Sequence, residues 1–241
     1  MADVVLLNHA EHADLRVLEG HGEAYGDAVN LVPVFPTEFV ELQREYPILF
    51  REGEDGAYSA VALLGFDRGE NLFLSEGRWR ARYVPGIQAR GPFSLALRHA
   101  QGEEAPPEAM IHIDLASPRI SRSEGHRLFS EEGGNTPYLE AMAATLVRLH
   151  DGARTAPAMF DALGGAGLIQ PVALELDTGT EHGHRLDGFF TIDQRRFAEL
   201  SGEDLSRLNT GGFLAAAFCV AASFENVRYL ADLKAGRRTL P

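Results

Sequence analysis

Short apolar segments, each followed by a turn, succeed one another through the first half of this chain without a long helix between them. They occupy residues 47–52, 58–66, 70–85, 93–98 and 110–115. Antiparallel strands can be joined by a tight turn, whereas parallel neighbours need a long crossover connection. We therefore predict an α+β fold with a mostly antiparallel sheet in the N-terminal half, packed with helices.

After Ser121 the pattern changes to helical periodicity. In the segment 135–152, Thr136 suits the N-cap, Pro137 suits the first turn, and apolar residues fall on one face. Gly152 is predicted to end this helix. A separate short helix over 156–167 is then expected, stopped by glycines.

Further elements are predicted in this half of the chain. A short helix is expected over 123–133 and a second hairpin near 170–192, after which Asp193 can cap another short helix. The segment 212–233 is nearly all apolar in its first half, and a helix that is apolar on every side is usually buried. We predict that this segment is a helix buried in the core.

Neither an internal repeat nor a low-complexity tract or linker divides the sequence. We therefore interpret residues 1–241 as one domain. Its parts would be a peripheral N-terminal segment at 1–29, a strand-rich part at 30–120 and a helix-rich part at 121–241.

Composition argues against several classes of function. The formal net charge is −13, whereas broad binding to nucleic acid or anionic membranes needs a positive field. The one cysteine, Cys219, cannot form an internal disulfide, and the N-terminal residues lack a secretory signal pattern. The longest apolar run, 213–224, is shorter than the roughly 20 residues that span a bilayer. We predict a cytoplasmic protein without membrane insertion and without a cofactor.

The segment 73–98 contains five arginines and the chain's only tryptophan. If residues 77–84 form a strand, alternating side chains create a basic face and an aromatic face that packs on the core. These faces would consist of Arg78, Arg80 and Arg82 on one side and Trp79, Ala81 and Tyr83 on the other.

A row of guanidinium groups would suit the carboxylate or phosphate groups of a partner. The alternative is a solvated strand face, balanced by some of the 35 acidic side chains. Arg90, which precedes a turning stretch, is open to a structural or a ligand-facing role. The candidate residues for binding a partner or an anion are Arg78, Trp79, Arg80, Arg82, Tyr83 and Arg90.

Motifs for catalysis are weak in this sequence. Glu181, His182 and His184 form an E-H-x-H cluster, and two histidines at this spacing on a strand point the same way, as metal ligands can. A solvated hairpin tip explains the same residues. The sequence contains neither a G-x-S-x-G elbow nor a phosphate-binding loop, so no nucleophile or nucleotide site is predicted.

Six segments, in order along nearly the whole chain, resemble the SapC family of bacterial proteins. They are "NLVPVFPTEFVELQREYPILF", "ALLGFDRGENLFLSEGRWRARYVPGIQARGPF", "EGHRLFSEEGGNTPYLEA", "LIQPVALEL", "LDGFFTIDQRRFAELSGEDL" and "AASFENVRYLADLK". The family name implies a link with a bacterial surface layer, against which the lack of a signal pattern counts. Similar sequences often lie beside TonB-dependent receptors, halogenase-like proteins and cupin-like oxygenase candidates, which implies an accessory role in uptake or modification. The resemblance carries over no catalytic residue.

The sequence thus favours a non-catalytic accessory protein that binds a protein or peptide partner. Two alternatives stay open: a metal-dependent enzyme with a dispersed site, and a structural protein associated with a surface layer. The apolar C-terminal helix would also allow homo-oligomers, although burial in the core explains it equally well.

Overall fold

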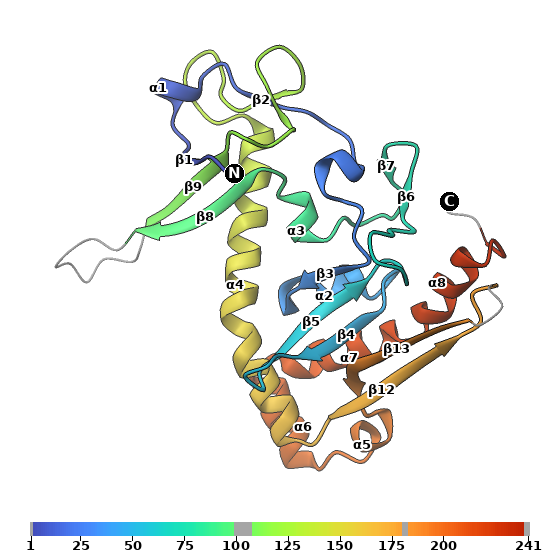
Figure 1. Cartoon of the computed structure of the whole chain (residues 1–241). Helices are drawn as coiled ribbons and strands as arrows, with labels where there is room; N and C mark the ends of the chain where they lie inside the picture. The colour runs from blue at the N-terminus through green and yellow to red at the C-terminus, as the bar shows by residue number, and fades with distance from the viewer. Residues whose placement is uncertain (1, 99–107, 180–182, 239–241) are drawn as a thin grey trace. The chain divides into compact units, whose positions relative to one another are not determined.

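The computed structural model describes residues 2–98, 108–179 and 183–238, and its contacts divide the chain into two compact units (Figure 1). The first unit consists of Met1–Asp27 and Gly86–His150, and the second of Ala28–Pro85 and Asp151–Pro241. Both units combine antiparallel strands with helices, which confirms the predicted α+β class.

The first unit contains two small antiparallel sheets, in the orders β1-β9-β8 and β10-β2-β11. The strands are β1 (Val4–Leu6), β2 (Arg16–Val17), β8 (Phe93–Arg98), β9 (Glu108–Asp114), β10 (Ile120–Ser121) and β11 (His126–Arg127). The helices are α1 (His9–His12), α3 (Gly86–Ala89) and the first half of α4 (Pro137–Gly165).

One apolar cluster forms the core of the first unit. Its buried members are Leu15, Val17, Phe93, Ile113, Leu128, Phe129, Leu139 and Leu146. Leu139 and Leu146 lie on the predicted apolar face of α4. Thr136 Oγ1 accepts a hydrogen bond from the Leu139 amide at 3.4 Å, as predicted for the N-cap.

The prediction of a short helix over 123–133 is wrong. Residues 126 and 127 form β11 and pair with β2, a strand far away in the sequence. Gly125 allows this pairing, because its φ is +94° and a Cβ there would lie 2.3 Å from the Val17 carbonyl oxygen. The non-local strand pairing therefore overrides the local helical pattern.

The second unit is built on a five-stranded antiparallel sheet in the order β12-β13-β4-β5-β3. Its strands are β3 (Leu31–Val34), β4 (Ile48–Glu52), β5 (Tyr58–Leu63), β12 (Ile169–Leu176) and β13 (His184–Ile192). The last two form the predicted second hairpin. Pro33 and Pro171 lie in the two edge strands, where a missing N–H is tolerated.

Both faces of this sheet are covered at its centre. Ile48, Leu49 and Phe50 of β4 are consecutive and each is 0% exposed, so side chains pointing to either face are buried. The covering helices of this unit are α2 (Phe39–Leu42), the second half of α4, α5 (Gln194–Ala198), α6 (Gly202–Thr210), α7 (Phe213–Ser223) and α8 (Asn226–Lys234). Helix α7 packs against β4 and β13.

Helix α4 is longer than predicted, because Gly152 does not end it and Pro157 lies inside it. Gly152 instead permits a close approach. A Cβ at this position would lie 2.5 Å from both Phe35 Cβ and Thr37 Oγ1. Farther along, the ring of Phe160 packs edge-on against Phe50, with centroids 5.1 Å apart.

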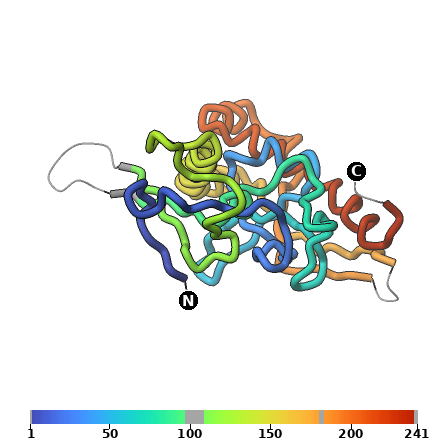
Figure 2. The backbone as a smooth tube through the Cα atoms, turned by 90° about the horizontal axis from the view of Figure 1, so that it is seen from above, coloured from blue at the N-terminus to red at the C-terminus, as the bar shows by residue number. Residues whose placement is uncertain are grey.

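The C-terminal helix α8 is held to the second unit by polar contacts. Figure 2 shows it beside the ends of β12 and β13, and Arg237, which follows the helix, binds the Asp177 carboxylate at 2.6 Å. At the start of α8, the Asn226 side-chain amide donates to the carbonyl oxygens of Gln43 at 2.9 Å and Tyr46 at 3.1 Å.

Candidate functional site

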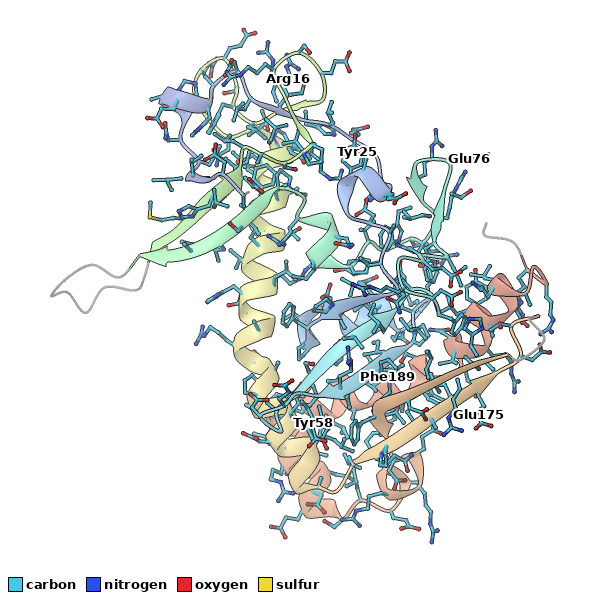
Figure 3. The ribbon with its side chains drawn as sticks, in the orientation of Figure 1. Arg16, Tyr25, Tyr58, Glu76, Glu175 and Phe189 are labelled. Atoms are coloured by element: carbon cyan, nitrogen blue, oxygen red, sulfur yellow. The ribbon has the colours of Figure 1, made fainter. Side chains whose placement is uncertain are left out.

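The arginine segment begins as a two-stranded hairpin, β6 (Leu74–Ser75) and β7 (Arg78–Trp79). Its turn consists of Glu76 and Gly77, both at positive φ (51° and 72°), and Figure 3 shows Glu76 at the outer tip. The strand ends at Trp79, so the expected strand over 77–84 is not formed beyond this residue. The predicted alternation of faces therefore does not extend to the later residues of the segment.

The aromatic residues of the segment belong to an interior hydrogen-bond network. Trp79 is 8% exposed, and its indole N–H donates to the Tyr46 hydroxyl at 2.7 Å. That hydroxyl donates to the Tyr83 carbonyl oxygen at 2.5 Å, and burial raises the pKa of Tyr46 far above its ordinary value. The Tyr83 hydroxyl donates in turn to the buried carboxylate of Glu38 at 2.8 Å, which also accepts from the Phe35 amide.

Arg78, Arg80 and Arg82 were expected to form a row, but only Arg78 lies in a strand. Arg80 binds the Glu76 carboxylate at 3.0 Å, whereas Arg78 and Arg82 are exposed. The side chains of Arg78 and Arg82 form no ion pair with any residue that the structure describes. The backbone of Arg82 is fixed by its amide, which donates to Glu45 at 2.8 Å. Two open guanidinium groups thus remain near this hairpin.

Arg90 belongs to the first unit, and one of its hydrogen bonds supports a structural role. Its Nη1 donates to the Phe93 carbonyl oxygen at 2.6 Å, which fixes the turn. Its Nε is buried and has no hydrogen-bond partner among the described residues. The side chain also lines an open depression of about 590 Å³, together with Ser94, Asp114 and Ser117.

His184, one of the two candidate metal ligands, is held in a polar network. Its Nδ1 lies 2.6 Å from Thr178 Oγ1 and its Nε2 lies 3.1 Å from Asp67 Oδ1. The Lys234 ammonium binds Asp67 Oδ2 at 2.7 Å and also binds Glu70. Glu181 and His182 lie outside the described residues. Within residues 2–98, 108–179 and 183–238, no three His, Cys, Asp or Glu side chains are grouped to hold a metal ion.

Removing the ammonium group of this network is expected to change the acid stability of the protein. Hydrogen bonds from Lys234 first, and from His184 second, hold the pKa of Asp67 below its ordinary value of 3.8. The stabilisation is therefore present above the unfolded-state pKa and is lost as the pH falls through the lower folded-state pKa. In Lys234→Gln, the pKa of Asp67 should rise toward 3.8, as an NMR titration of the carboxyl carbon would measure.

Arg237→Gln provides the matched control, because Arg237 pairs with Asp177 and not with Asp67. In this control variant, the pKa of Asp67 should stay as low as in the wild type. The free energy of unfolding in urea should be measured at a series of pH values. As the pH falls below about 4, this free energy should decrease less in Lys234→Gln than in the wild type. An Asp67 titration that is the same in the wild type and in Lys234→Gln would contradict the assigned pairing.

An apolar groove that the sequence did not predict lies between α5, α6 and α7. Helix α7 has no charged residue, yet it buries only one side, formed by Ala216, Ala217, Val220 and Ser223. Phe218 is 59% exposed and packs edge-on against Phe197 of α5, with ring centroids 4.7 Å apart. The groove has a volume of about 460 Å³ and is lined by Gln194, Phe197, Ala198, Leu205, Phe218, Ala221 and Ala222.

A second, more polar cavity adjoins this groove at Gln194, which lines both. Its volume is about 510 Å³, and its lining consists of Gln170, Val172, Thr191, Ile192, Asp193, Gln194, Arg195 and Phe224. Asp193 caps α5 as predicted, with Oδ1 accepting from the Arg196 amide at 3.0 Å. Thr191 is 5% exposed, and its hydroxyl has no hydrogen-bond partner among the described residues.

Comparison with known proteins decides the family. The family model described as SapC matches residues 7–230, which include most of both units. This chain belongs to the SapC family. No curated protein and no solved structure matches it.

The SapC match includes both the hairpin β6–β7 and the groove. It also includes most of Phe213–Lys234, which is long and apolar enough by composition to cross a membrane. Core helices of soluble proteins share this property, and 33% of the apolar window is buried here. The segment divides into α7 and α8, and Asn226 and Lys234 of α8 bind other parts of the second unit.

Sequence patterns alone did not locate the groove in this SapC chain. An apolar helix shows no periodicity from which a buried side can be distinguished from an exposed one. The one feature of the sequence that points to the groove is the presence of Phe197 and Leu205 a short distance before the apolar run. That signal indicates an apolar region and does not indicate whether the region is buried.

Proposed function

We propose that this SapC protein is a non-catalytic accessory protein that binds a protein or peptide partner in the groove between α5, α6 and α7. The observation that carries the proposal is the exposed ring of Phe218 on a helix without charged residues. Burying a Phe side chain contributes about 1.5–3 kcal/mol, so leaving one in water forgoes a large stabilisation. Exposed apolar patches of this kind commonly mark interaction sites.

The shape of the groove favours an inserted side chain over a flat contact. Phe197 and Phe218 stand against each other at an interplanar angle of 73°, and Leu205 and Ala198 add apolar walls. Interfaces are often anchored by one aromatic or large aliphatic side chain in such a recess. The partner is therefore a polypeptide segment that presents an aromatic or large aliphatic residue.

Arg78 and Arg82 supply a second proposed contact surface on the same unit. Figure 1 places the hairpin β6–β7 and helix α5 at opposite ends of this unit, so one short peptide does not bridge both. Open guanidinium groups suit carboxylates, and mutating such exposed charges mainly changes the association rate and its salt dependence. We assign acidic groups of a larger partner to these two arginines.

The proposal is tested by selecting peptides from a displayed random library on the immobilised wild-type protein. The selected peptides should be enriched in aromatic and large aliphatic residues. Phe218→Asp should weaken their binding at least about tenfold, because it places a charge in the apolar recess. Fluorescence polarisation of labelled peptides would measure this change.

Val40→Asp is the matched control, because Val40 is 55% exposed on α2 and does not line the groove. This variant should bind the selected peptides as the wild type does. Both variants should unfold at nearly the wild-type urea concentration, since both positions are exposed. Peptides that bind Phe218→Asp as tightly as the wild type would refute the proposed site.

A further inference from the structure

The polar cavity beside the groove is lined by Thr191, whose hydroxyl is buried. Thr191 on β13 is 5% exposed, and its Oγ1 has no partner among the residues that the structure describes. Buried hydroxyl groups are nearly always hydrogen-bonded, because an unpaired hydroxyl has lost its hydrogen bonds to water without gaining a replacement. Thr191 lines the cavity, and rotation about its Cα–Cβ bond exchanges the positions of the hydroxyl and the methyl group.

The other polar side chains of the cavity are two neutral amides and two charged groups. Gln170 lies opposite Thr191 in the register of β12 and β13, and Gln194 lies where the cavity meets the groove. The charged groups already have partners, since Asp193 caps α5 and Arg195 lies 3.5 Å from Glu199. A hydroxyl with two carboxamides can pair with both the N–H and the C=O of a peptide bond.

We propose that the polar cavity binds the main-chain amide next to the side chain that fills the groove. This inference rests on the proposed function and specifies its ligand as a peptide rather than a purely apolar molecule. The ring of an aromatic residue would contact Phe197 and Phe218. The adjoining peptide group would pair with Thr191 and Gln170. A hydrocarbon chain would fill the groove and leave the Thr191 hydroxyl unpaired.

Two small probes separate these contributions. N-acetyl-L-phenylalaninamide carries the aromatic ring with two amide groups, whereas toluene carries the ring alone. In titrations followed by backbone amide NMR shifts, N-acetyl-L-phenylalaninamide should shift the signals of residues in both the groove and the polar cavity. Toluene should shift only the signals of residues in the groove. Thr191→Val should weaken binding of N-acetyl-L-phenylalaninamide about three- to tenfold, the range of one net hydrogen bond. It should leave toluene binding unchanged.

Stability distinguishes a binding role of Thr191 from a structural one. Valine has nearly the same shape and removes a hydroxyl that has no partner within the described part of the chain, so the urea midpoint of Thr191→Val should stay equal or rise. Thr191→Ser keeps the hydroxyl and should retain the wild-type affinity for N-acetyl-L-phenylalaninamide. A lower urea midpoint together with weaker binding of both probes would assign Thr191 a structural role and overturn the inference.

The outcomes also separate this inference from the proposed function. If Phe218→Asp abolishes binding of both probes and Thr191→Val changes neither, the groove stands and the role of the polar cavity is refuted. If Phe218→Asp changes neither probe, the groove itself is refuted. An absence of shifts at Thr191 and Gln170 with N-acetyl-L-phenylalaninamide would also refute the role of the cavity.

Discussion

Gly152→Ala is expected to destabilise the protein by about 3 kcal/mol, the upper part of the range for overpacked sites. Helix propensity alone predicts the opposite sign, a gain of up to about 1 kcal/mol for alanine inside a helix. The steric term decides, because the new Cβ would lie 2.5 Å from both Phe35 Cβ and Thr37 Oγ1. Neither contact can be relieved by rotating the end of a long side chain. Urea unfolding followed by circular dichroism would measure the change.

Gly164→Ala is the control for this substitution, since Gly164 lies in the same helix and a Cβ there would meet nothing within 4 Å. It should be neutral or slightly stabilising. If Gly152→Ala were also neutral, the close packing of α4 on the segment before α2 would be incorrect.

Ser223→Ala is expected to cost about 2 kcal/mol of unfolding free energy, which is typical of a buried donor left unpaired. Ser223 is 0% exposed on the buried side of α7. Its hydroxyl accepts from the Ile48 amide at 2.9 Å and donates to the Val220 carbonyl oxygen at 2.8 Å. The substitution leaves the amide at the start of β4 without this acceptor. Urea unfolding would measure the loss, and hydrogen exchange at Ile48 should become faster.

Thr210→Ala tests whether such a cost is specific to the buried site. The hydroxyl of Thr210 also donates to a carbonyl oxygen in its own helix, that of Ser206 at 2.9 Å, but it is exposed. Its loss should change the stability by less than about 0.5 kcal/mol. If the two substitutions changed the free energy of unfolding equally, the hydrogen bond between Ser223 of α7 and Ile48 of β4 would contribute nothing to stability.

The sequence predicted those parts of the fold that local chemistry controls. Thr136 and Asp193 cap helices as expected, and turn residues correctly separated the antiparallel strands. The failures involve contacts between distant segments. Gly125 permits the close approach to Val17 that the strand pairing requires. Gly152 permits the close contact of α4 with Phe35. In both cases a local pattern gave the wrong element or the wrong boundary.

The candidate site was harder to predict for the same reason. Trp79 was expected to face the core, and it is buried, but its hydrogen-bond partner Tyr46 lies 33 residues away. The predicted basic row required a strand over residues 77–84. The observed strand β7 ends at Trp79, before Arg80. Phe218 gave no signal, since apolar residues surround it on every side of α7. Only the packing of α7 on one side reveals which apolar side chains remain in water.

The prolines at the two margins of the five-stranded sheet have a consequence for self-association. Pro33 in β3 and Pro171 in β12 each remove one main-chain donor from a strand that a neighbouring molecule could otherwise extend. Fibre growth by successive strand addition is therefore penalised at both ends of the sheet. Contacts between copies at high concentration are therefore disfavoured at these two margins of the sheet.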